Sequence, residues 1–262
     1  MDAKRHFINS AYLSVSMLLF SVSSAAFGAP STTIRVAAAA NLKKCLDEAL
    51  IPAFQKETGD RVTVTYGSTQ LLARQLENGK PEDVFLSADT KTVDNLVQEH
   101  VLNGASERVY AIGRLVLWTR ADASLHPKNI HDLSNLSYAN IAIANPKLAP
   151  YGAASIESLH KAGLDASVAG RIVQAGNISD ALQYAKTGNS DAAFTALSLV
   201  IKDKKDPYII IPEALHQPIR QSAALVGAGP DTTGSLFLNF LSSAAAVRIW
   251  KNYGYALPSA QR

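Results

Sequence analysis

The sequence predicts a two-lobed α/β protein in which each lobe is a mainly parallel sheet flanked by helices, and three observations support this prediction. Short apolar or β-branched segments alternate with segments whose apolar residues recur at helical spacing, a pattern typical of parallel sheets with right-handed crossovers. The alternation runs over 31–115, stops in a polar, proline-containing stretch at 119–131, and then starts again. The 262 residues are enough for two lobes of ordinary size, with a single doubly wound sheet as the alternative.

The N-terminal segment has the composition of an export signal. Lys4 and Arg5 precede an apolar stretch at 11–27, whose end is rich in small residues. This order predicts a cleaved signal peptide over 1–28, with cleavage after Gly28 or after Ala26. A membrane anchor is the alternative, but the stretch is short for a spanning helix and contains four serines. The mature protein is therefore expected in the periplasm.

The first half of the chain contains four predicted strands, at 34–39, 61–66, 83–87 and 112–118. A helix should follow the first strand, with Asn41 as its N-cap, Gly59 as its C-terminal stop and a kink or break at Pro52. Cys45 lies on the apolar stripe of this helix and is expected to be a buried, inert thiol. The second helix should begin at 67–69, and Asp89 should cap the third.

The second half repeats the alternation and then returns to the first lobe. Further strands are predicted at 140–144, 191–195, 208–211 and 220–226, with helices that begin at 151–152 and 177–179 and two more near the C-terminus. The pattern predicts a first lobe made of 29–115 plus 220–262 and a second lobe made of 116–219. Hinges are expected near 115–120 and 215–222.

Composition and motifs argue against several classes of function. Without 1–28, which hold two basic residues and one acidic residue, the 25 basic and 22 acidic residues become 23 and 21, and this balance disfavours nucleic acid as a partner. One cysteine allows no internal disulfide, and the six histidines lack metal-ligand spacing. No serine lies in a nucleophile motif, so neither catalytic residues nor an enzyme activity is expected. Glu82 and Asp83 are interpreted as a solvated turn.

Four strand-to-helix junctions share an unusual composition. They contain neutral donors and no ionisable group apart from a tyrosine, and they are Ala40-Asn41, Gly67-Ser68-Thr69, Pro150-Tyr151-Gly152 and Asn177-Ile178-Ser179. Taken singly, each is an ordinary cap or turn. Taken together, they would offer unpaired backbone N–H groups at the edge where ligands bind in parallel α/β sheets, an arrangement that favours a small anion. A site made only of donors favours a fully deprotonated oxyanion, such as sulfate, molybdate or tungstate.

At these junctions the sequence resembles the periplasmic molybdate-binding proteins, the substrate-binding components of molybdate ABC transporters. The resemblance covers the mature chain, and the matching segments are Val36-Ala-Ala-Ala-Ala-Asn-Leu42, Gly67-Ser-Thr69, Leu72-Ala-Arg-Gln75, Asp83-Val-Phe-Leu-Ser-Ala-Asp89, Tyr110-Ala-Ile-Gly-Arg-Leu-Val-Leu-Trp118, Ile141-Ala-Ile-Ala-Asn-Pro146, Ala149-Pro-Tyr-Gly152 and Gly254-Tyr-Ala-Leu-Pro258. The resemblance implies a two-lobed periplasmic binding protein fold of type II, with the anion in the cleft.

The resemblance also implies roles for individual residues. Asn41, with Ala40 beside it, would give the anion side-chain and backbone N–H bonds. Thr69 would donate its hydroxyl and N–H, with Ser68 adjoining. Two residues of the second lobe, Tyr151 and Ile178, would donate their backbone N–H groups.

The chain departs from the family pattern at two positions. Thr195 replaces a tyrosine that contacts the anion in some members, and Thr69 replaces a serine, which adds a methyl group that could narrow the pocket.

The resemblance implies that the protein captures molybdate or tungstate and delivers it to an ABC transporter permease. It also implies a monomer that needs no cofactor and whose side chains do not coordinate a metal directly. The alternative is a binding protein for another oxyanion, such as sulfate or phosphate. An organic acid would favour an arginine clamp, but Arg74, Arg114 and Arg120 lie outside the four junctions.

Overall fold

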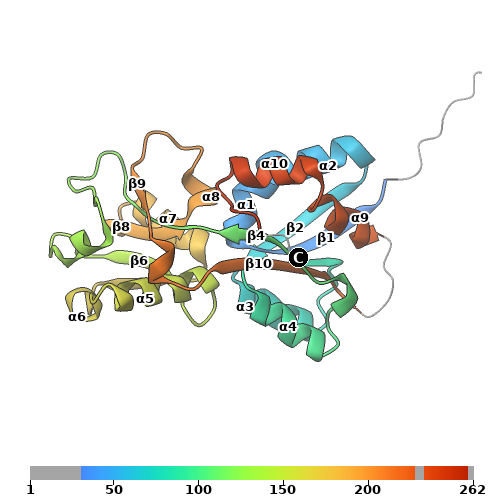
Figure 1. The fold of residues 1–262 in the computed structure, drawn as a ribbon, viewed down its shortest axis with the longest axis horizontal. Helices are drawn as coiled ribbons and strands as arrows, with labels where there is room; N and C mark the ends of the chain where they lie inside the picture. Colours follow the sequence, from blue (N-terminus) through green and yellow to red (C-terminus); the bar gives the residue numbers. More distant parts are fainter. Residues whose placement is uncertain (1–30, 228–232, 259–262) are drawn as a thin grey trace, which may run out of the picture. The chain divides into compact units, whose positions relative to one another are not determined.

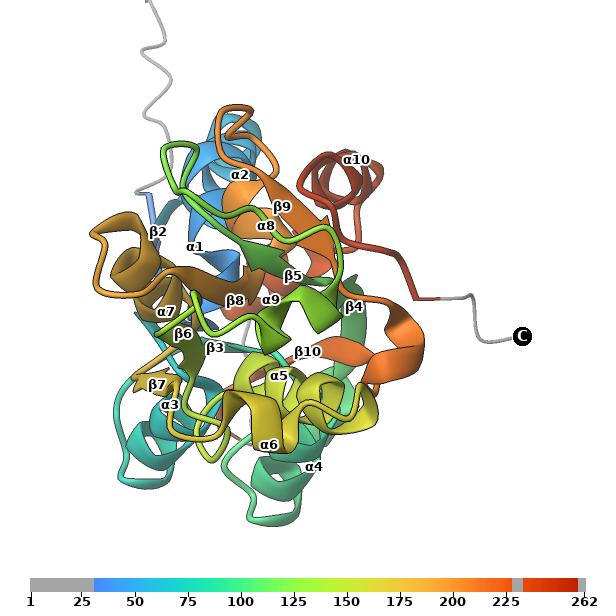
Figure 2. The same cartoon turned by 90° about the vertical axis from the view of Figure 1, so that its left-hand side faces the viewer.

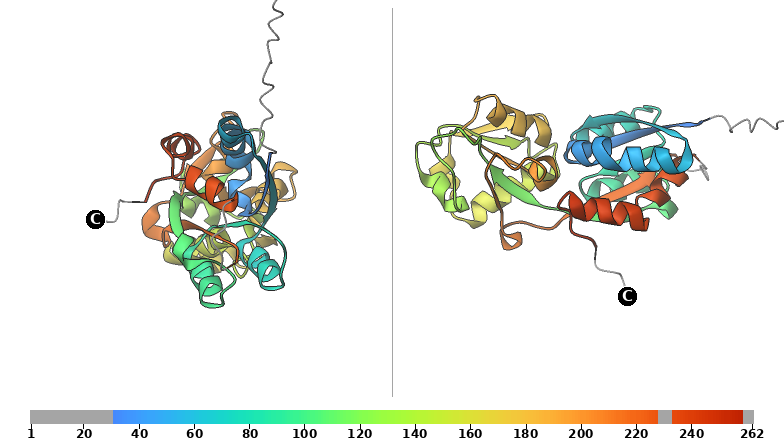
Figure 3. Two further views of the ribbon diagram at one scale, coloured as in Figure 1. Left: turned by 90° about the vertical axis from the view of Figure 1, so that its right-hand side faces the viewer. Right: turned by 90° about the horizontal axis from the view of Figure 1, so that it is seen from above.

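The structure, a computed structural model, describes residues 31–227 and 233–258. The predicted signal peptide over 1–28 lies outside the described residues. The described part contains two lobes, each built on a five-stranded sheet (Figures 1 and 3). The prediction of a two-lobed α/β protein is therefore confirmed.

The sheet of the first lobe combines the N-terminal strands with one late strand. Its members are β1 (Thr33–Ala39), β2 (Arg61–Gly67), β3 (Val84–Ser87), β4 (Arg108–Gly113) and β10 (Ile219–Leu225). Their order is β2-β1-β3-β10-β4, with β1 parallel to β2 and β3 and with β10 antiparallel to both of its neighbours. Four strands therefore run in one direction and β10 runs in the other.

The sheet of the second lobe repeats this plan. Its members are β5 (Leu115–Trp118), β6 (Ile141–Ala144), β7 (Ile172–Ala175), β8 (Ala192–Ala196) and β9 (Tyr208–Ile210). Their order is β7-β6-β8-β5-β9, and β5 is the antiparallel member. In each sheet, the antiparallel strand is the one that arrives from the other lobe.

The prediction of a single strand at 112–118 is wrong. The segment is divided between β4 and β5, which belong to different sheets and are separated only by Arg114. The apolar residues are continuous because both strands contribute buried residues to one hydrophobic core. Hydropathy does not register the change of sheet, because burial in either sheet selects the same residue types.

Helices cover both faces of each sheet (Figures 1 and 2). In the first lobe, the helical segments are η1 (Ala40–Leu42), α1 (Lys43–Cys45), the π-helical η2 (Leu46–Leu50), α2 (Ile51–Thr58), α3 (Thr69–Glu77), α4 (Thr90–Gln98), η3 (Gly104–Ser106), α9 (Thr233–Phe240) and α10 (Ala244–Asn252). In the second lobe, they are η4 (Ile130–Ser134), α5 (Pro150–Lys161), α6 (Asp165–Val168), α7 (Ile178–Lys186), α8 (Leu197–Val200) and η5 (Glu213–Leu215). Within the described ranges, no helix has the length and apolar character needed to cross a bilayer.

Several local predictions for the first lobe are confirmed. Gly59 ends α2 in the left-handed conformation, with φ of 80°, and the Asp89 side chain accepts the Thr92 N–H to cap α4. Cys45 is fully buried, and burial raises the pKa of its thiol above the usual range. The helix does not break at Pro52; it passes instead through the wider η2 turn directly before the proline.

The C-terminal helices pack into the core of the first lobe. Phe54 of α2 meets Phe237 and Phe240 of α9 edge-on, with ring centroids 5.1 and 5.5 Å apart. Trp250 of α10 packs between Tyr110 and Tyr255 and donates its indole N–H to the Leu241 carbonyl at 3.0 Å. These contacts fix the segment after β10 against the lobe in which the chain begins.

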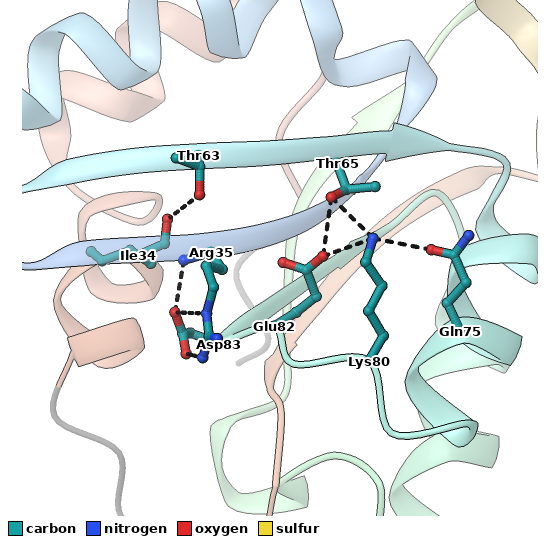
Figure 4. Close-up of polar contacts among 8 residues, drawn as sticks. All are labelled: Ile34, Arg35, Thr63, Thr65, Gln75, Lys80, Glu82 and Asp83. Carbon is teal, nitrogen blue, oxygen red and sulfur yellow. Dashed lines mark hydrogen bonds and ion pairs between the residues drawn. The ribbon is translucent and has the colours of Figure 1, made fainter.

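The interpretation of Glu82 and Asp83 as a solvated turn is wrong. Only 8% of Glu82 is exposed, and its carboxylate meets Lys80 at 3.0 Å and accepts the Thr65 hydroxyl (Figure 4). Asp83 accepts both the backbone N–H and the guanidinium of Arg35, at 2.7 and 2.8 Å. Both carboxylates therefore tie the loop before β3 to the neighbouring strands, because β1 and β2 present matching donors to it.

Asp83 makes stability depend on pH. Burial acts to raise the pKa of its carboxyl, but the hydrogen bonds and charge of Arg35 outweigh burial and lower it below the ordinary 3.8. Since the folded pKa is depressed, the carboxylate contributes stability above pH 3.8, and this contribution is lost as the pH falls toward the folded pKa.

We expect Asp83→Asn to lower the free energy of unfolding near neutral pH by at most about 1 kcal/mol, because Arg35 is half exposed. The deficit relative to the unmodified protein should shrink as the pH falls below about 4, as measured by urea unfolding. Asp122→Asn, which removes a pair with Arg120 that is far more exposed, is the matched control and should change little. A deficit at Asp83 that does not vary with pH would contradict the ion-pair account.

Candidate functional site

One small cavity lies where the two lobes meet. Its lining comes from all four junctions identified in the sequence and consists of Ala39, Ala40, Asn41, Gly67, Ser68, Thr69, Ala88, Ala149, Pro150, Tyr151, Asn177 and Ile178. The structure thus brings together all six residues expected at the site, which are Ala40, Asn41, Ser68, Thr69, Tyr151 and Ile178. Each of these six is at most 4% exposed.

Sheet register explains why the junctions converge. Ala39 and Gly67 are paired at the ends of the parallel strands β1 and β2, so η1 and α3 begin at one edge of the first sheet. Ala144 and Ala175 are paired at the ends of β6 and β7, so the segments leading to α5 and α7 leave one edge of the second sheet. These two edges face each other across the cavity, as expected where ligands bind in α/β sheets.

The cavity is narrow and carries no formal charge. Its volume is about 10 Å³, close to the ~10–15 Å³ that one water-sized sphere needs, so the lobes leave little free space between them in this arrangement. Its lining contains no lysine, arginine, histidine, aspartate or glutamate. Among the residues the structure describes, no group of three His, Cys, Asp or Glu side chains is placed to hold a metal ion.

The two hydroxyls of the Gly67–Thr69 junction differ in their bonding. The Ser68 Oγ is buried and has no hydrogen-bond partner. The Thr69 Oγ1 accepts the Ala88 N–H at 3.2 Å, which leaves the hydroxyl proton of Thr69 to donate elsewhere. An unpaired buried hydroxyl costs about 1–3 kcal/mol unless a ligand or water satisfies it. Ser68 is therefore the side chain that most clearly requires a partner in the cavity.

Asn41 does not have the local role expected of it. It lies inside η1 rather than at a helix N-cap, and its side chain caps nothing. Its two amide hydrogens point to Gln221 Oε1 and to the Tyr255 hydroxyl, at 2.9 and 3.0 Å. Both side-chain amide hydrogens are thus donated to protein acceptors and not to the cavity, where we expected the side chain to bind a ligand. The group of Asn41 that can donate to the cavity is its backbone N–H.

Tyr151 reaches from the second lobe to the end of β4 in the first lobe. A Cβ on Gly113 would lie 2.1 Å from the Tyr151 hydroxyl, so Gly113 makes room for the phenol beside β4. Burial raises the pKa of this phenol above its usual range, and the neighbouring Asn41 acts in the opposite direction. The hydroxyl makes no hydrogen bond of ordinary geometry.

Glycine also brings the start of α5 close to the second sheet. A Cβ on Gly152 would lie 2.2 Å from the Ala144 carbonyl oxygen, so only glycine allows the first turn of α5 to lie directly over the end of β6.

Ile178 begins α7, and its neighbours hold that helix end in place. Asn177 caps the helix by accepting the N–H groups of Ser179 and Asp180. Thr195 is fully buried and donates its hydroxyl to the Ile178 carbonyl at 3.4 Å. The Ile178 N–H is the first of its helix and so has no acceptor within α7.

Sequence reasoning missed the residues that support the site from other parts of the chain. Gln221 and Tyr255 hold Asn41, Ala88 holds Thr69, and Ser198 donates to the Asn41 carbonyl at 2.8 Å. None of them belongs to a junction, and Gln221 and Ser198 also lie outside the segments that carried the family resemblance. Long-range pairing of this kind leaves no local pattern.

We expect Gly113→Ala to destabilise the protein by about 1–3 kcal/mol, because the new methyl group would overlap the Tyr151 hydroxyl and the Gln221 amide. Thermal unfolding measures this loss. Gly176→Ala is the matched control, since its new methyl group would meet only the end of the Asp180 side chain at 3.2 Å. Equal melting temperatures for the two variants would show that Gly113 is not needed to seat Tyr151.

Comparison with known proteins places this site in a family. Residues 34–256 match the family described as bacterial extracellular solute-binding protein. The chain is 35% identical over 240 residues to molybdate-binding protein ModA of Azotobacter vinelandii, an alignment that covers 88% of this chain and 93% of that protein. It is 36% identical over 203 residues to molybdate-binding protein ModA of Rhodobacter capsulatus, covering 77% and 80%.

The solved structures agree with the sequence comparison. The Azotobacter vinelandii periplasmic molybdate-binding protein superposes with a TM-score of 0.81 at 31% identity, over 86% of this chain and all of that one. Both have the two-lobed, type II arrangement of periplasmic binding proteins. The chain therefore belongs to the bacterial extracellular solute-binding protein family, and its relatives there include periplasmic molybdate-binding proteins.

Proposed function

We propose that this protein captures molybdate or tungstate in the cavity between its lobes and delivers the anion to an ABC transporter permease. The observation that carries the proposal is the buried, unpaired Ser68 hydroxyl in an uncharged cavity lined by four helix starts. The names of the relatives support molybdate as the anion.

The proposed ligand set consists of donors from both lobes. In the first lobe, the Ser68 and Thr69 hydroxyls and the N–H groups of Ala40, Asn41 and Thr69 face the anion. In the second lobe, the N–H groups of Tyr151 and Ile178 complete the set. Hydrogen bonds to a charged group contribute about 1.5–3 kcal/mol each. Several such bonds can offset the loss of hydration of a small dianion without a buried countercharge.

The chemistry of this set selects the protonation state of the anion. The lining has no carboxylate, so a protonated oxyanion such as hydrogen phosphate would find no charged acceptor for its proton. A fully deprotonated tetrahedral dianion suits the site better. Sulfate is the alternative ligand of the same charge and shape, and the size of the cavity would have to separate it from molybdate.

Closure of the lobes completes the proposed mechanism. We place the first lobe at 29–115 plus 220–262 and the second at 116–219, since the chain changes sheet between β4 and β5 and again between β9 and β10. The anion bonds to both half-sites and so stabilises the closed state by its differential affinity. The permease then recognises the closed surface.

The remaining parts of the proposal follow from the family and the composition. The family is extracellular, and we place this member in the periplasm as a monomer after removal of residues 1–28. The protein needs no cofactor and catalyses no reaction, because its role is to bind and release an unchanged anion.

Titration calorimetry of the mature protein with molybdate, tungstate, sulfate and phosphate at one ionic strength tests the proposal. We expect one-to-one, tight binding of molybdate and tungstate and much weaker binding of sulfate and phosphate. Tight sulfate binding would keep the oxyanion mechanism but change the ligand. Failure of all four anions to bind would overturn the proposed function.

We expect Ser68→Ala to weaken molybdate binding by roughly tenfold to a hundredfold, because it removes one hydrogen bond to a charged ligand. Ser190→Ala is the matched control, since the Ser190 Oγ is also buried and unpaired but lies outside the cavity. Its affinity should equal that of the unmodified protein. Equal affinities for both variants would remove Ser68 from the ligand set.

A further inference from the structure

The second lobe donates two serine hydroxyls to the backbone of the first. Ser179 of α7 donates to the Ala40 carbonyl at 2.9 Å, and Ser198 of α8 donates to the Asn41 carbonyl at 2.8 Å. The two acceptors are consecutive carbonyls of the segment that lines the cavity. Two different elements of one lobe therefore hold a single short segment of the other.

Each of the two carbonyl oxygens accepts two hydrogen bonds when the lobes are in contact. The Ala40 oxygen also accepts the Lys43 N–H, and the Asn41 oxygen also accepts the Tyr255 hydroxyl at 3.1 Å. A carbonyl oxygen has two lone pairs, so in each case one bond comes from the first lobe and the second from the other lobe. Opening the cleft would break the second bond at both positions and leave the first intact.

The geometry of the peptide bond links these contacts to the ligand. In a trans peptide, the C=O of one residue and the N–H of the next point in opposite directions in one plane. The hydroxyl of Ser179 on the Ala40 carbonyl therefore fixes the direction of the Asn41 N–H, which belongs to the proposed ligand set. Hydrogen bonds in such a chain also polarise one another, which strengthens the donor.

We propose that Ser179 and Ser198 form a closing latch that sets the affinity for the anion without touching it. This inference rests on the proposed function, because the two serine contacts would favour the closed lobes, the state that binds the anion. Ser198 acts near the hinge, where the adjacent Leu197 N–H donates to the Arg114 carbonyl at 2.9 Å. Ser179 acts beside the cavity, next to Ile178.

A latch of this kind predicts a distinctive pattern of affinities. The apparent dissociation constant equals the intrinsic constant divided by the fraction of closed protein. Removing a latch contact lowers the fraction of closed protein, and this decrease is the same for every anion. Molybdate, tungstate and sulfate should therefore lose the same factor in affinity, and the preference among them should not change.

The test compares Ser179→Ala, Ser198→Ala and the double variant with the unmodified protein. Calorimetry should show that each single change lowers the affinity for all three anions by roughly fivefold to tenfold, the effect of one lost hydrogen bond. Stopped-flow measurements should assign most of this loss to faster dissociation. Ser179→Thr, which keeps the hydroxyl, should restore most of the affinity.

The control is Ser158→Ala, which removes a hydroxyl-to-carbonyl bond of 2.7 Å within α5. Its anion affinities should equal those of the unmodified protein, and melting temperatures without anion show whether any variant fails to fold. Unchanged affinities in both latch variants would overturn the latch and leave the proposed function intact. Losses that differ among the anions by more than roughly threefold would also overturn it, because such losses indicate direct contact. Absence of anion binding by the unmodified protein would overturn the proposed function and the latch together.

Discussion

The first N–H groups of a helix have no acceptor within that helix, and the cleft depends on this constraint. In each lobe, parallel strands end at the same edge, so two sets of these donors lie together there. When the edges of the two lobes face each other, the donors surround a cavity that needs no buried cation. Glycine at 113 makes room for the Tyr151 phenol of the other lobe, and glycine at 152 lets the first turn of α5 lie over the end of β6.

A binding site divided between two lobes couples recognition to movement. In the proposed function, each lobe supplies only part of the donors that replace the hydration of the dianion, so both half-sites are needed at once. The same closure buries polar atoms of the first lobe that need partners, and Ser179 and Ser198 supply them for Ala40 and Asn41. In the mechanism that we propose, ligand contacts and contacts between the lobes form together, which makes the closed state a distinct and cooperative state.

Much of the fold follows from local pattern, and the errors have identifiable causes. Strand–helix alternation predicted most of the strands, and the stop at Gly59 and the cap at Asp89 were read directly from residue type. The single strand predicted at 112–118 was wrong because consecutive strands of two different sheets select the same buried apolar residues. The prediction of Asn41 as a helix N-cap was wrong for a different reason. An asparagine just before a helix usually caps that helix, whereas here the Asn41 side chain donates to Gln221 and Tyr255.

The sequence by itself predicted the two-lobed α/β class and the four junctions, because periodicity and helix-start chemistry are local properties. The family resemblance pointed to six residues within these junctions, and all six are among the residues that line the cavity. The tertiary structure alone decided how each of these residues is bonded. Ser68 is left without a partner, Thr69 is engaged by Ala88, and the carbonyls at 40 and 41 are held from the other lobe. Such bonds join residues up to 214 positions apart in the chain, as between Asn41 and Tyr255. Their partners are set by how the sheets bring distant segments together, and no local spacing in the sequence encodes that.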